Sequence, residues 1–383
     1  MTVKSVRTNF TYYHIIRFSN LSFQKALLPA ARCISSGNVT FRHLKCIIGV
    51  CGRQCFFVCL RGGVESMPFQ QDNFMGSDGE TLISYFKMVP DTQPKAVVQI
   101  VHGMCEYMER YMELAEYLCD KGYIICGEDH MGHGKTVGEG GIYGYFGRED
   151  GWEHLIEDVE KLHRVMKETY KDLPYIILGH SMGSFIARNW YARYGNDCAG
   201  LILSGTAKSN KLLRPLTVLA KIQRLFVGDK RAANMLARTI NNQYLKKISR
   251  PKTSSDWISH DEDVVKKYVS DPLCTFTFTH SGYIDLFRLL RECNAESWYD
   301  SIPKDKPILL ISGDEDPVGD YGEGPQEIYD KLIESGQVKV TIDIRHGMRH
   351  EPHNEIGREA VYQRYAAYLY DNFVKEDKKT KSE

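Results

Sequence analysis

The sequence predicts an α/β fold: a mostly parallel sheet with helices on both faces and an inserted helical cap. Strand-like and helix-like segments alternate over residues 67–206 and again over residues 301–375. Parallel strands need long crossover connections, which are usually helices, so this alternation favours a parallel sheet. Residues 207–300 lack the alternation, and we predict that they form the cap.

The part before the cap supplies most of the predicted strands. Short apolar runs predict strands at residues 81–89, 96–103, 123–130, 174–180 and 199–205. Between these strands, apolar residues recur at helical spacing, which predicts helices over residues 110–122, over residues 151–172 and after Ser181. The first of these helices ends at Gly122, a residue type that commonly stops helices.

After the cap, the alternation resumes. Strands are predicted at residues 306–314 and 338–344, and helices at residues 325–336 and 358–374. Ligands of open parallel sheets bind beyond the carboxyl ends of the strands, so functional residues are expected in the loops that follow each strand. The polar tail, residues 376–383, is predicted to be disordered.

The first 66 residues differ in composition from the rest of the chain. Residues 1–64 hold nine Lys or Arg and no Asp or Glu, so the remaining chain carries 40 basic and 49 acidic residues. We interpret residues 1–66 as a basic, Cys-rich extension that is disordered, part of a transit peptide, or upstream of a true start at Met67. A transit peptide in residues 1–34 would imply a mitochondrial location.

The cysteines and the apolar runs bear on the class of protein. Five of the eleven cysteines lie in the extension, where the spacing of Cys51, Cys55 and Cys59 fits no zinc or iron–sulfur pattern. The other six are scattered through apolar segments, as is typical of reduced thiols in the cytoplasm. No run approaches the ~18 apolar residues of a membrane span. We expect a soluble cytoplasmic protein with at most peripheral membrane contact and no nucleic-acid partner.

A serine stands where a predicted strand passes abruptly into a predicted helix. The sequence Gly179-His180-Ser181-Met182-Gly183 follows the apolar run 175–178 and fits the pattern G-x-S-x-G. In a sharp strand-to-helix turn, glycines let the two elements approach each other and leave the hydroxyl exposed above the helix N-terminus. This context predicts that Ser181 is a nucleophile.

A serine hydroxyl needs a base and an orienting carboxylate before it can attack. Asp314 and Asp316 follow the strand at 306–314, and His346, His350 and His353 follow the strand at 338–344. Asp316 and His350 lie farther along their loops than Asp314 and His346, which favours them as triad members. The order Ser, Asp, His agrees with this interpretation.

The negative oxygen that forms during acyl transfer needs backbone donors. The N–H of Met182, next to Ser181 at the helix start, is one candidate. The N–H of Met104 is the other, because the loop His102-Gly103-Met104 follows the strand at 96–103. Removing a single donor of this kind lowers the rate by about 10²–10³.

Several of these segments together resemble one known group of proteins. HGMCEYMERY, DHMGHGKT, GHSMG, ISGDEDP and GMRHEPHNE are similar to segments of the monoacylglycerol lipase and lysophospholipase group of α/β-hydrolases. The resemblance covers most of residues 72–375 and is weakest in the cap. It implies an α/β-hydrolase fold, no cofactor, a triad and an oxyanion hole formed by Ser181, Asp316, His350, Met104 and Met182.

The resemblance also implies residues around the leaving group. In monoacylglycerol lipases of this group, polar residues near the leaving glycerol match Glu106, Arg110, Tyr268 and His353. One position departs from the group, whose second histidine is replaced by Tyr107. A structural ion pair between Glu106 and Arg110 is an equally good interpretation of those two residues.

The cap carries an unusual charge. Residues 207–255 hold twelve Lys or Arg and a single acid, Asp229. The predicted helix that starts at Pro215 is apolar over a wide arc, with Lys221 and Arg224 opposite. One interpretation is a cap that contacts an anionic membrane or steers phosphate-bearing lipids. The alternative is a helix whose apolar face closes the pocket and whose lysines are only solvated.

We therefore predict a serine hydrolase that cleaves esters of monoacyl lipids through an acyl-enzyme, without metal or cofactor. One alternative is an aminopeptidase-like or small-ester hydrolase, and a peptidase would need an acidic pocket for which Glu106 is the only obvious candidate. Another is a non-catalytic binding protein, although such proteins usually lack a triad member. The segment 129–134, with Asp129 and two histidines, is interpreted through the resemblance as a structural turn and not as a metal site.

Overall fold

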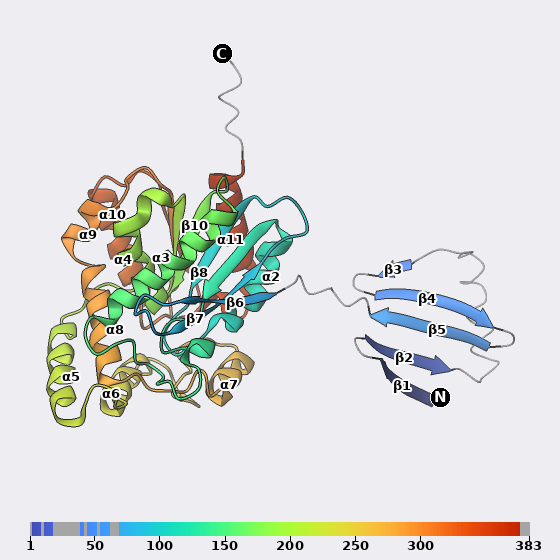
Figure 1. Ribbon diagram of the computed structural model, residues 1–383, viewed down its shortest axis with the longest axis horizontal. Helices are drawn as coiled ribbons and strands as arrows, with labels where there is room; N and C mark the ends of the chain where they lie inside the picture. Colours follow the sequence, from blue (N-terminus) through green and yellow to red (C-terminus); the bar gives the residue numbers. More distant parts are fainter. Residues whose placement is uncertain are drawn as a thin grey trace, which may run out of the picture. The chain divides into compact units, whose positions relative to one another are not determined.

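The computed structural model describes the backbone of residues 2–8, 11–17, 39–41, 44–51 and 54–61, and the backbone and side chains of residues 69–375 (Figure 1). The chain divides into two compact units, Met1–Pro68 and Phe69–Glu383. The proposed start at Met67, the tail at 376–383 and the side chains of the first five cysteines lie outside the described residues.

The first unit contains an antiparallel sheet of five strands in the order β1-β2-β5-β4-β3. The strands are β1 (Thr2–Thr8), β2 (Thr11–Arg17), β3 (Val39–Phe41), β4 (Leu44–Cys51) and β5 (Gln54–Arg61). The interpretations of residues 1–66 as a transit peptide or as sequence upstream of the true start stay predictions.

The second unit is built on an eight-stranded sheet in the order β13-β12-β11-β10-β8-β9-β7-β6. Its strands are β6 (Gln70–Met75), β7 (Leu82–Met88), β8 (Ala96–Val101), β9 (Tyr123–Glu128), β10 (Tyr175–His180), β11 (Gly200–Ser204), β12 (Ile308–Gly313) and β13 (Val340–Arg345). The six strands from β8 to β13 pair in parallel, and β6 and β7 are antiparallel. The prediction of a mostly parallel sheet is confirmed.

Helices cover both faces of this sheet (Figure 1). They are α2 (Met112–Asp120), α3 (Gly151–Thr169), α4 (Met182–Tyr194), α10 (Glu323–Glu334) and α11 (Arg358–Phe373). Helices α2 and α11 pack together on one face, and α3 packs beside α4 on the other. Every residue of β8 to β12 is buried, because strands covered on both faces expose neither set of side chains.

Strand β6 was not predicted from the sequence. Five of its six residues are exposed, since it forms the edge of the sheet and pairs only with β7. Its sequence, Gln70-Gln71-Asp72-Asn73-Phe74-Met75, lacks the apolar alternation that marks a half-buried strand. Polar residues on an edge strand also discourage pairing with a second chain.

The segment between β11 and β12 is helical. It contains α5 (Leu213–Val227), α6 (Asn234–Tyr244), α7 (Glu262–Ser270), α8 (His280–Glu292) and α9 (Glu296–Ser301). Helix α5 begins two residues before the predicted start at Pro215. Helix α8 packs against α3, α4 and α5 and so joins the cap to the core. No helix of the described residues has both the length and the apolar character that crossing a membrane requires.

Candidate active site

Ser181 occupies the turn between β10 and α4, where the chain changes direction sharply. Its backbone has φ 52° and ψ −123°, a conformation that is strained for a residue with a side chain. A Cβ atom at Gly183 would lie 1.9 Å from the carbonyl oxygen of Val101. A glycine is therefore required there for α4 to pack so close to β8. Ser181 is partly exposed, whereas His180 and Met182 on either side are buried.

Ser181, His350 and Asp316 form a continuous chain of contacts. His350 Nε2 lies 2.8 Å from Ser181 Oγ, and His350 Nδ1 lies 2.9 Å from Asp316 Oδ1. Asp316 is fully buried and also accepts a hydrogen bond of 2.8 Å from the N–H of Val318. The three side chains come from the loops after β10, β12 and β13, so one edge of the sheet brings them together.

Asp314 and His346, the neighbours that were not chosen as triad members, pair with each other. His346 Nδ1 lies 2.7 Å from Asp314 Oδ2, and the side chain of His346 is 97% exposed. Asp314 and His346 thus contact each other at the surface and are not part of the buried contacts that connect Ser181 with His350 and Asp316.

The electrostatic surroundings favour a charged imidazole at His350. Burial by itself lowers the pKa of His350, but the charge of Asp316 and its hydrogen bond outweigh burial and raise this pKa above its ordinary value of 6.5. A carboxylate that stabilises the imidazolium helps a histidine take a proton from a serine hydroxyl.

The loop that carries His350 is bonded to the cap. The N–H of Glu351 donates to the carbonyl of Ile258 at 2.8 Å. The guanidinium of Arg349 donates to the carbonyl of Asp256 at 2.6 Å. The position of His350 therefore depends on the cap segment between α6 and α7, as well as on the end of β13.

The two predicted oxyanion donors stand on either side of the nucleophile. Met182 is the first residue of α4, and the loop of Met104 lies directly against Ser181. A Cβ atom at Gly103 would be 3.1 Å from the Cβ of Ser181. Among the described residues, no hydrogen-bond acceptor satisfies the N–H of Met104 or that of Met182, so both are free to bind an oxygen.

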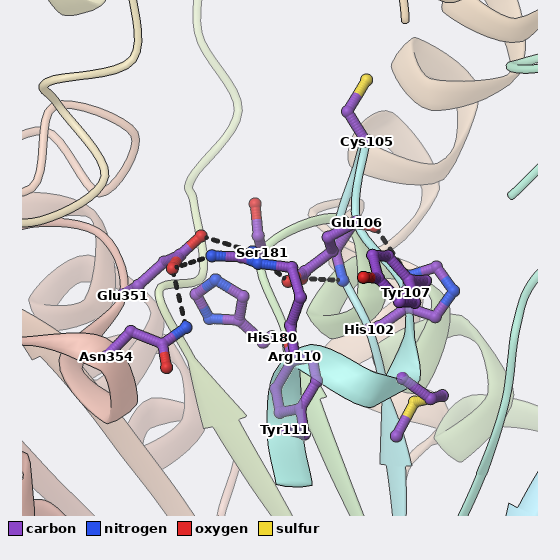
Figure 2. Close-up of polar contacts among 12 residues, drawn as sticks. His102, Cys105, Glu106, Tyr107, Arg110, Tyr111, His180, Ser181, Glu351 and Asn354 are labelled. Carbon is purple, nitrogen blue, oxygen red and sulfur yellow. Dashed lines mark hydrogen bonds and ion pairs between the residues drawn. The ribbon is translucent and has the colours of Figure 1, made fainter. Parts of the chain in front are cut away.

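Glu106 and Arg110 form an ion pair that includes a third residue, Glu351 (Figure 2). Arg110 donates to Glu106 at 2.6 Å and makes two hydrogen bonds to Glu351, at 2.9 and 2.7 Å. Glu106 also accepts hydrogen bonds from the hydroxyl of Tyr111, at 2.7 Å, and from the N–H of Gly103. The ion pair of Glu106 and Arg110 is therefore present, and a role of these two residues near the leaving group stays a prediction.

The guanidinium of Arg110 contacts two buried carboxylates, Glu106 and Glu351, and their pKa values shift in opposite directions. Burial raises the pKa of Glu106 above 4.5, and the charge of Arg110 only partly opposes it. Burial acts the same way on Glu351, but the two bonds from Arg110 lower the pKa of Glu351 to about 2. Arg110 is thus most tightly coupled to Glu351.

Tyr268 and His353, the other two predicted leaving-group residues, lie in the same cluster. The guanidinium carbon of Arg110 lies 4.8 Å from the centre of the Tyr268 ring. The ring of His353 stacks on Tyr111 with a centroid distance of 4.7 Å. Burial lowers the pKa of His353 to about 4, so its imidazole is neutral. Its Nε2 atom is buried and has no hydrogen-bond partner among the described residues.

This geometry can be compared with known proteins. A family model described as serine aminopeptidase, S33, matches residues 92–357. The chain belongs to this family.

Lipases and esterases are among the relatives of this S33-family chain. The human monoglyceride lipase is 29% identical over 296 residues, which cover 76% of this chain and 87% of that protein. A monoacylglycerol lipase of Mycolicibacterium smegmatis is 25% identical over 78% of this chain and 96% of that protein. A carboxyl esterase structure from Bacillus coagulans, in complex with glycerol, has a TM-score of 0.75 at 31% identity, covering 80% of this chain and all of that one. The chain is a serine ester hydrolase of the monoacylglycerol lipase-like group of α/β-hydrolases.

Two contacts of this S33 hydrolase were not predicted from its sequence. Glu351 stands next to His350, and this adjacency is the only sequence signal for its pairing with Arg110. The hydroxyl of Tyr107 donates to the carboxylate of Asp271 at 2.8 Å. Asp271 directly follows α7, so Tyr107, at the position where the group has histidine, joins the loop after β8 to the cap.

The histidine-rich turn after β9 of the hydrolase is held by its own contacts. Asp129 accepts hydrogen bonds of 2.8 Å from the N–H groups of Met108 and Lys135, and His133 Nε2 accepts one of 3.3 Å from the N–H of Cys105. Within residues 69–375, no group of three His, Cys, Asp or Glu side chains is arranged to hold a metal ion. The six cysteines of this part are buried and unpaired.

Proposed function

We propose that this enzyme hydrolyses the carboxylic ester of a monoacyl lipid, with a monoacylglycerol as its preferred substrate, through an acyl-enzyme on Ser181. The observation that carries the proposal is the continuous contact from Ser181 Oγ to His350 and from His350 to the buried Asp316. Nucleophile, base and orienting carboxylate in this order are the parts that acyl transfer requires.

In the proposed mechanism, Ser181 Oγ attacks the ester carbonyl while its proton passes to His350 Nε2. The oxygen that becomes negative is bound by the N–H groups of Met104 and Met182. His350 then gives its proton to the leaving alcohol, and the acyl group remains on Ser181. A water molecule, deprotonated by His350, attacks the acyl-enzyme and releases the fatty acid and the free serine.

The surroundings of the triad support a small polar leaving group. His353 presents a neutral, unpartnered nitrogen, which can bind one hydroxyl. Its T-shaped contact with His180, at 4.7 Å, and the contact of His180 with His350, at 4.9 Å, keep it close to the reacting centre. In this proposal Glu106 and Arg110 act mainly by fixing the loop around the leaving group, because their bonding groups are already engaged.

Peptide hydrolysis is an alternative, because the family model is described as a serine aminopeptidase. The charges of the site argue against this activity. A peptidase of this kind must bind a protonated amine with a carboxylate. Glu106, the candidate for that role, already accepts hydrogen bonds from Gly103, Arg110 and Tyr111. Three donors, one of them the Arg110 cation, leave Glu106 with about one acceptor position for an amine.

The test follows fatty-acid release from a monoacylglycerol and a lysophosphatidylcholine in parallel, with an amino-acid anilide as the peptidase substrate. The full chain is compared with Ser181→Ala. We expect hydrolysis of both lipids, faster for the monoacylglycerol, and loss of both activities in Ser181→Ala. Equal rates for wild type and variant on every lipid would contradict the proposal. Cleavage of the anilide alone would favour a peptidase, and unmeasurable activity on all substrates would favour a binding protein.

We further propose that the cap contacts a lipid surface through α5. Only two residues of this helix, Leu213 and Ala220, are buried. Leu225 and Phe226 are 82% and 83% exposed, and the other exposed apolar residues of the helix are Val218, Leu219, Ile222 and Val227. An amphipathic helix of this kind, with cations on its other face, is typical of proteins that bind at a bilayer interface. The alternative, an apolar face that closes the pocket, does not account for this exposure.

Vesicle flotation tests this contact. The double variant Leu225→Asp, Phe226→Asp should lose binding to anionic vesicles and retain hydrolysis of a water-soluble short-chain ester. The matched control, Ile333→Asp, changes an exposed apolar residue of α10 that is 46% exposed and should bind as the wild type does. Unchanged binding of the double variant would contradict the proposal.

A further inference from the structure

A cavity of about 130 Å³ lies between the cap and the core, where α5 and α8 meet the start of α3. Figure 1 shows α5 beside α8 at the edge of the cap. At roughly 30 Å³ for each water molecule, this space holds about four waters or one small oxyanion. None of the residues proposed for catalysis or for the leaving group lines it.

The rim of the cavity is rich in cations. It is lined by Arg148, Lys221, Arg224, Arg288 and Arg291. Lys221 has no ion-pair partner among the described residues. Two rim acids, Glu149 and Asp150, offset part of this charge, and Glu149 lies 3.5 Å from Arg224. Arg288 and Arg291 also pair with Glu292, at 2.9 and 3.0 Å. The five cations still outnumber the three lining acids, Glu149, Asp150 and Asp285, and an excess of positive charge around a small, partly open space raises the local concentration of anions.

The floor of the cavity holds two buried polar groups. Ser281, near the start of α8, is 2% exposed, and its hydroxyl has no hydrogen-bond partner among the described residues. A buried polar atom without a partner is unfavourable unless a water or a ligand satisfies it. Asp285, one turn further along α8, is 5% exposed. Burial raises the pKa of Asp285 to about 7, which reduces the negative charge of its carboxyl near neutral pH.

We infer that this cavity binds a phosphate group, with Lys221 and Arg288 at the rim and the hydroxyl of Ser281 at the floor as its ligands. Lysine and arginine side chains are the usual partners of phosphate oxygens, and hydrogen bonds to an ionised group are stronger than those between neutral groups. A hydroxyl at the floor supplies the donor that a tetrahedral oxyanion needs on the side away from the cations. The phosphate group can come from free phosphate or from a phospholipid head group.

The inference goes beyond the proposed hydrolysis, because it assigns a second site that lies apart from Ser181. Its occupant would bind where the cap meets the core, in contact with α5, α8 and the start of α3. The same anion would neutralise cations of α5 and of α8 and so hold α5 against the core.

The experiment measures binding of inorganic phosphate to the full chain by isothermal titration calorimetry. Ser181→Ala should bind phosphate as the wild type does, which separates this site from the catalytic one. Ser281→Ala removes a hydroxyl that bonds to nothing in the protein, so it should leave the melting temperature unchanged and weaken phosphate binding about tenfold. A purely structural role for Ser281 would not produce that result.

The rim is tested by the double variant Lys221→Ala, Arg288→Ala, which should also bind phosphate at least about tenfold more weakly. Its matched control is Arg238→Ala, Lys266→Ala, which removes two exposed cap cations outside the cavity and should leave phosphate binding unchanged. An equal loss in both double variants would mean non-specific attraction and would overturn the site.

A second arm separates the two sources of the phosphate group. It measures flotation with vesicles of phosphatidylcholine alone and with added phosphatidic acid. If calorimetry detects phosphate and both Ser281→Ala and the rim variant weaken it, the site takes the free anion. If only the added binding to phosphatidic acid is lost in those variants, the site takes the lipid head group. If neither probe distinguishes them from the wild type and the control, the inference is wrong.

Discussion

Arg110 makes two hydrogen bonds to Glu351, a residue 241 positions later in the chain. This contact joins the loop that carries the Met104 donor to the loop that carries His350. The two loops follow β8 and β13, which are separated in the sheet by three other strands. A buried ion pair therefore fixes the distance between the proposed oxyanion hole and the proposed base.

Removal of Arg110 should destabilise the protein strongly. Arg110→Ala leaves Glu106 and Glu351 buried without a cation, and breaking a buried pair in this way costs about 3–5 kcal/mol. Urea denaturation of wild type and variant measures the loss of unfolding free energy. Arg110→Lys is the matched control: it keeps the charge without the two-pronged geometry and should lose less. A loss below about 1 kcal/mol for Arg110→Ala would place the pair among weak surface ion pairs.

The two aspartates after β12 should differ in their effect on catalysis. Asp316→Asn removes the charge that orients and stabilises His350 and should lower kcat on the order of 10⁴-fold. Asp314→Asn changes a residue of the same loop whose partner is the exposed His346 and should leave kcat nearly unchanged. Steady-state ester hydrolysis by both variants decides the assignment, and a larger loss in Asp314→Asn would reverse it.

The rate of ester hydrolysis should fall in acid. His350 acts as a base only when neutral, and its pKa is raised above 6.5 by Asp316. Activity is therefore full above this pKa and is lost as the pH drops through it. A profile of kcat/KM against pH should show a single acid limb with a midpoint above 6.5. His346→Ala should show the same midpoint, and a shift in that control would mean that His350 is not the titrating group.

Tyr107 should matter for the position of the cap. Tyr107→Phe leaves the carboxylate of Asp271 without its tyrosine partner, and loss of a hydrogen bond to a charged group lowers stability by about 1.5–3 kcal/mol. We expect a higher KM for a monoacylglycerol and little change for a short water-soluble ester, since only the lipid must contact the cap. Asp271→Asn serves as the partner control. A variant whose kcat falls equally on both substrates would show that Tyr107 acts on the chemistry itself.

Much of the core was predictable because its signals are local. Each strand from β8 to β12 is a short apolar run bounded by polar or glycine residues, and the order of Ser181, Asp316 and His350 follows from the strand ends. Within each loop, Asp316 was preferred to Asp314 and His350 to His346 because each lies farther from the end of its strand. The surface pair of Asp314 and His346 agrees with that choice.

The parts that sequence reasoning missed depend on contacts between distant segments. Strand β6 is defined by its pairing with β7 and not by its own polar sequence. The pairing of Arg110 with Glu351 and of Tyr107 with Asp271 requires loops and cap to be folded together. The charge of the cap was visible in the sequence, but the cavity beneath Lys221 forms only when α5, α8 and α3 meet.

The hydrogen bonds between the His350 loop and the cap also constrain how the cap can move. Lifting the whole cap as one rigid body would break the bonds from Glu351 to Ile258 and from Arg349 to Asp256. The loss of these bonds would allow His350 to move away from Ser181. Helices α5 and α6 precede this attachment in the chain, and α5 has its own anchor, because it packs on α8, which contacts α3 and α4 of the core. The cap segment at residues 256–258 and the loop of His350 are therefore mechanically coupled, so a movement of this segment would alter the contact between His350 and Ser181.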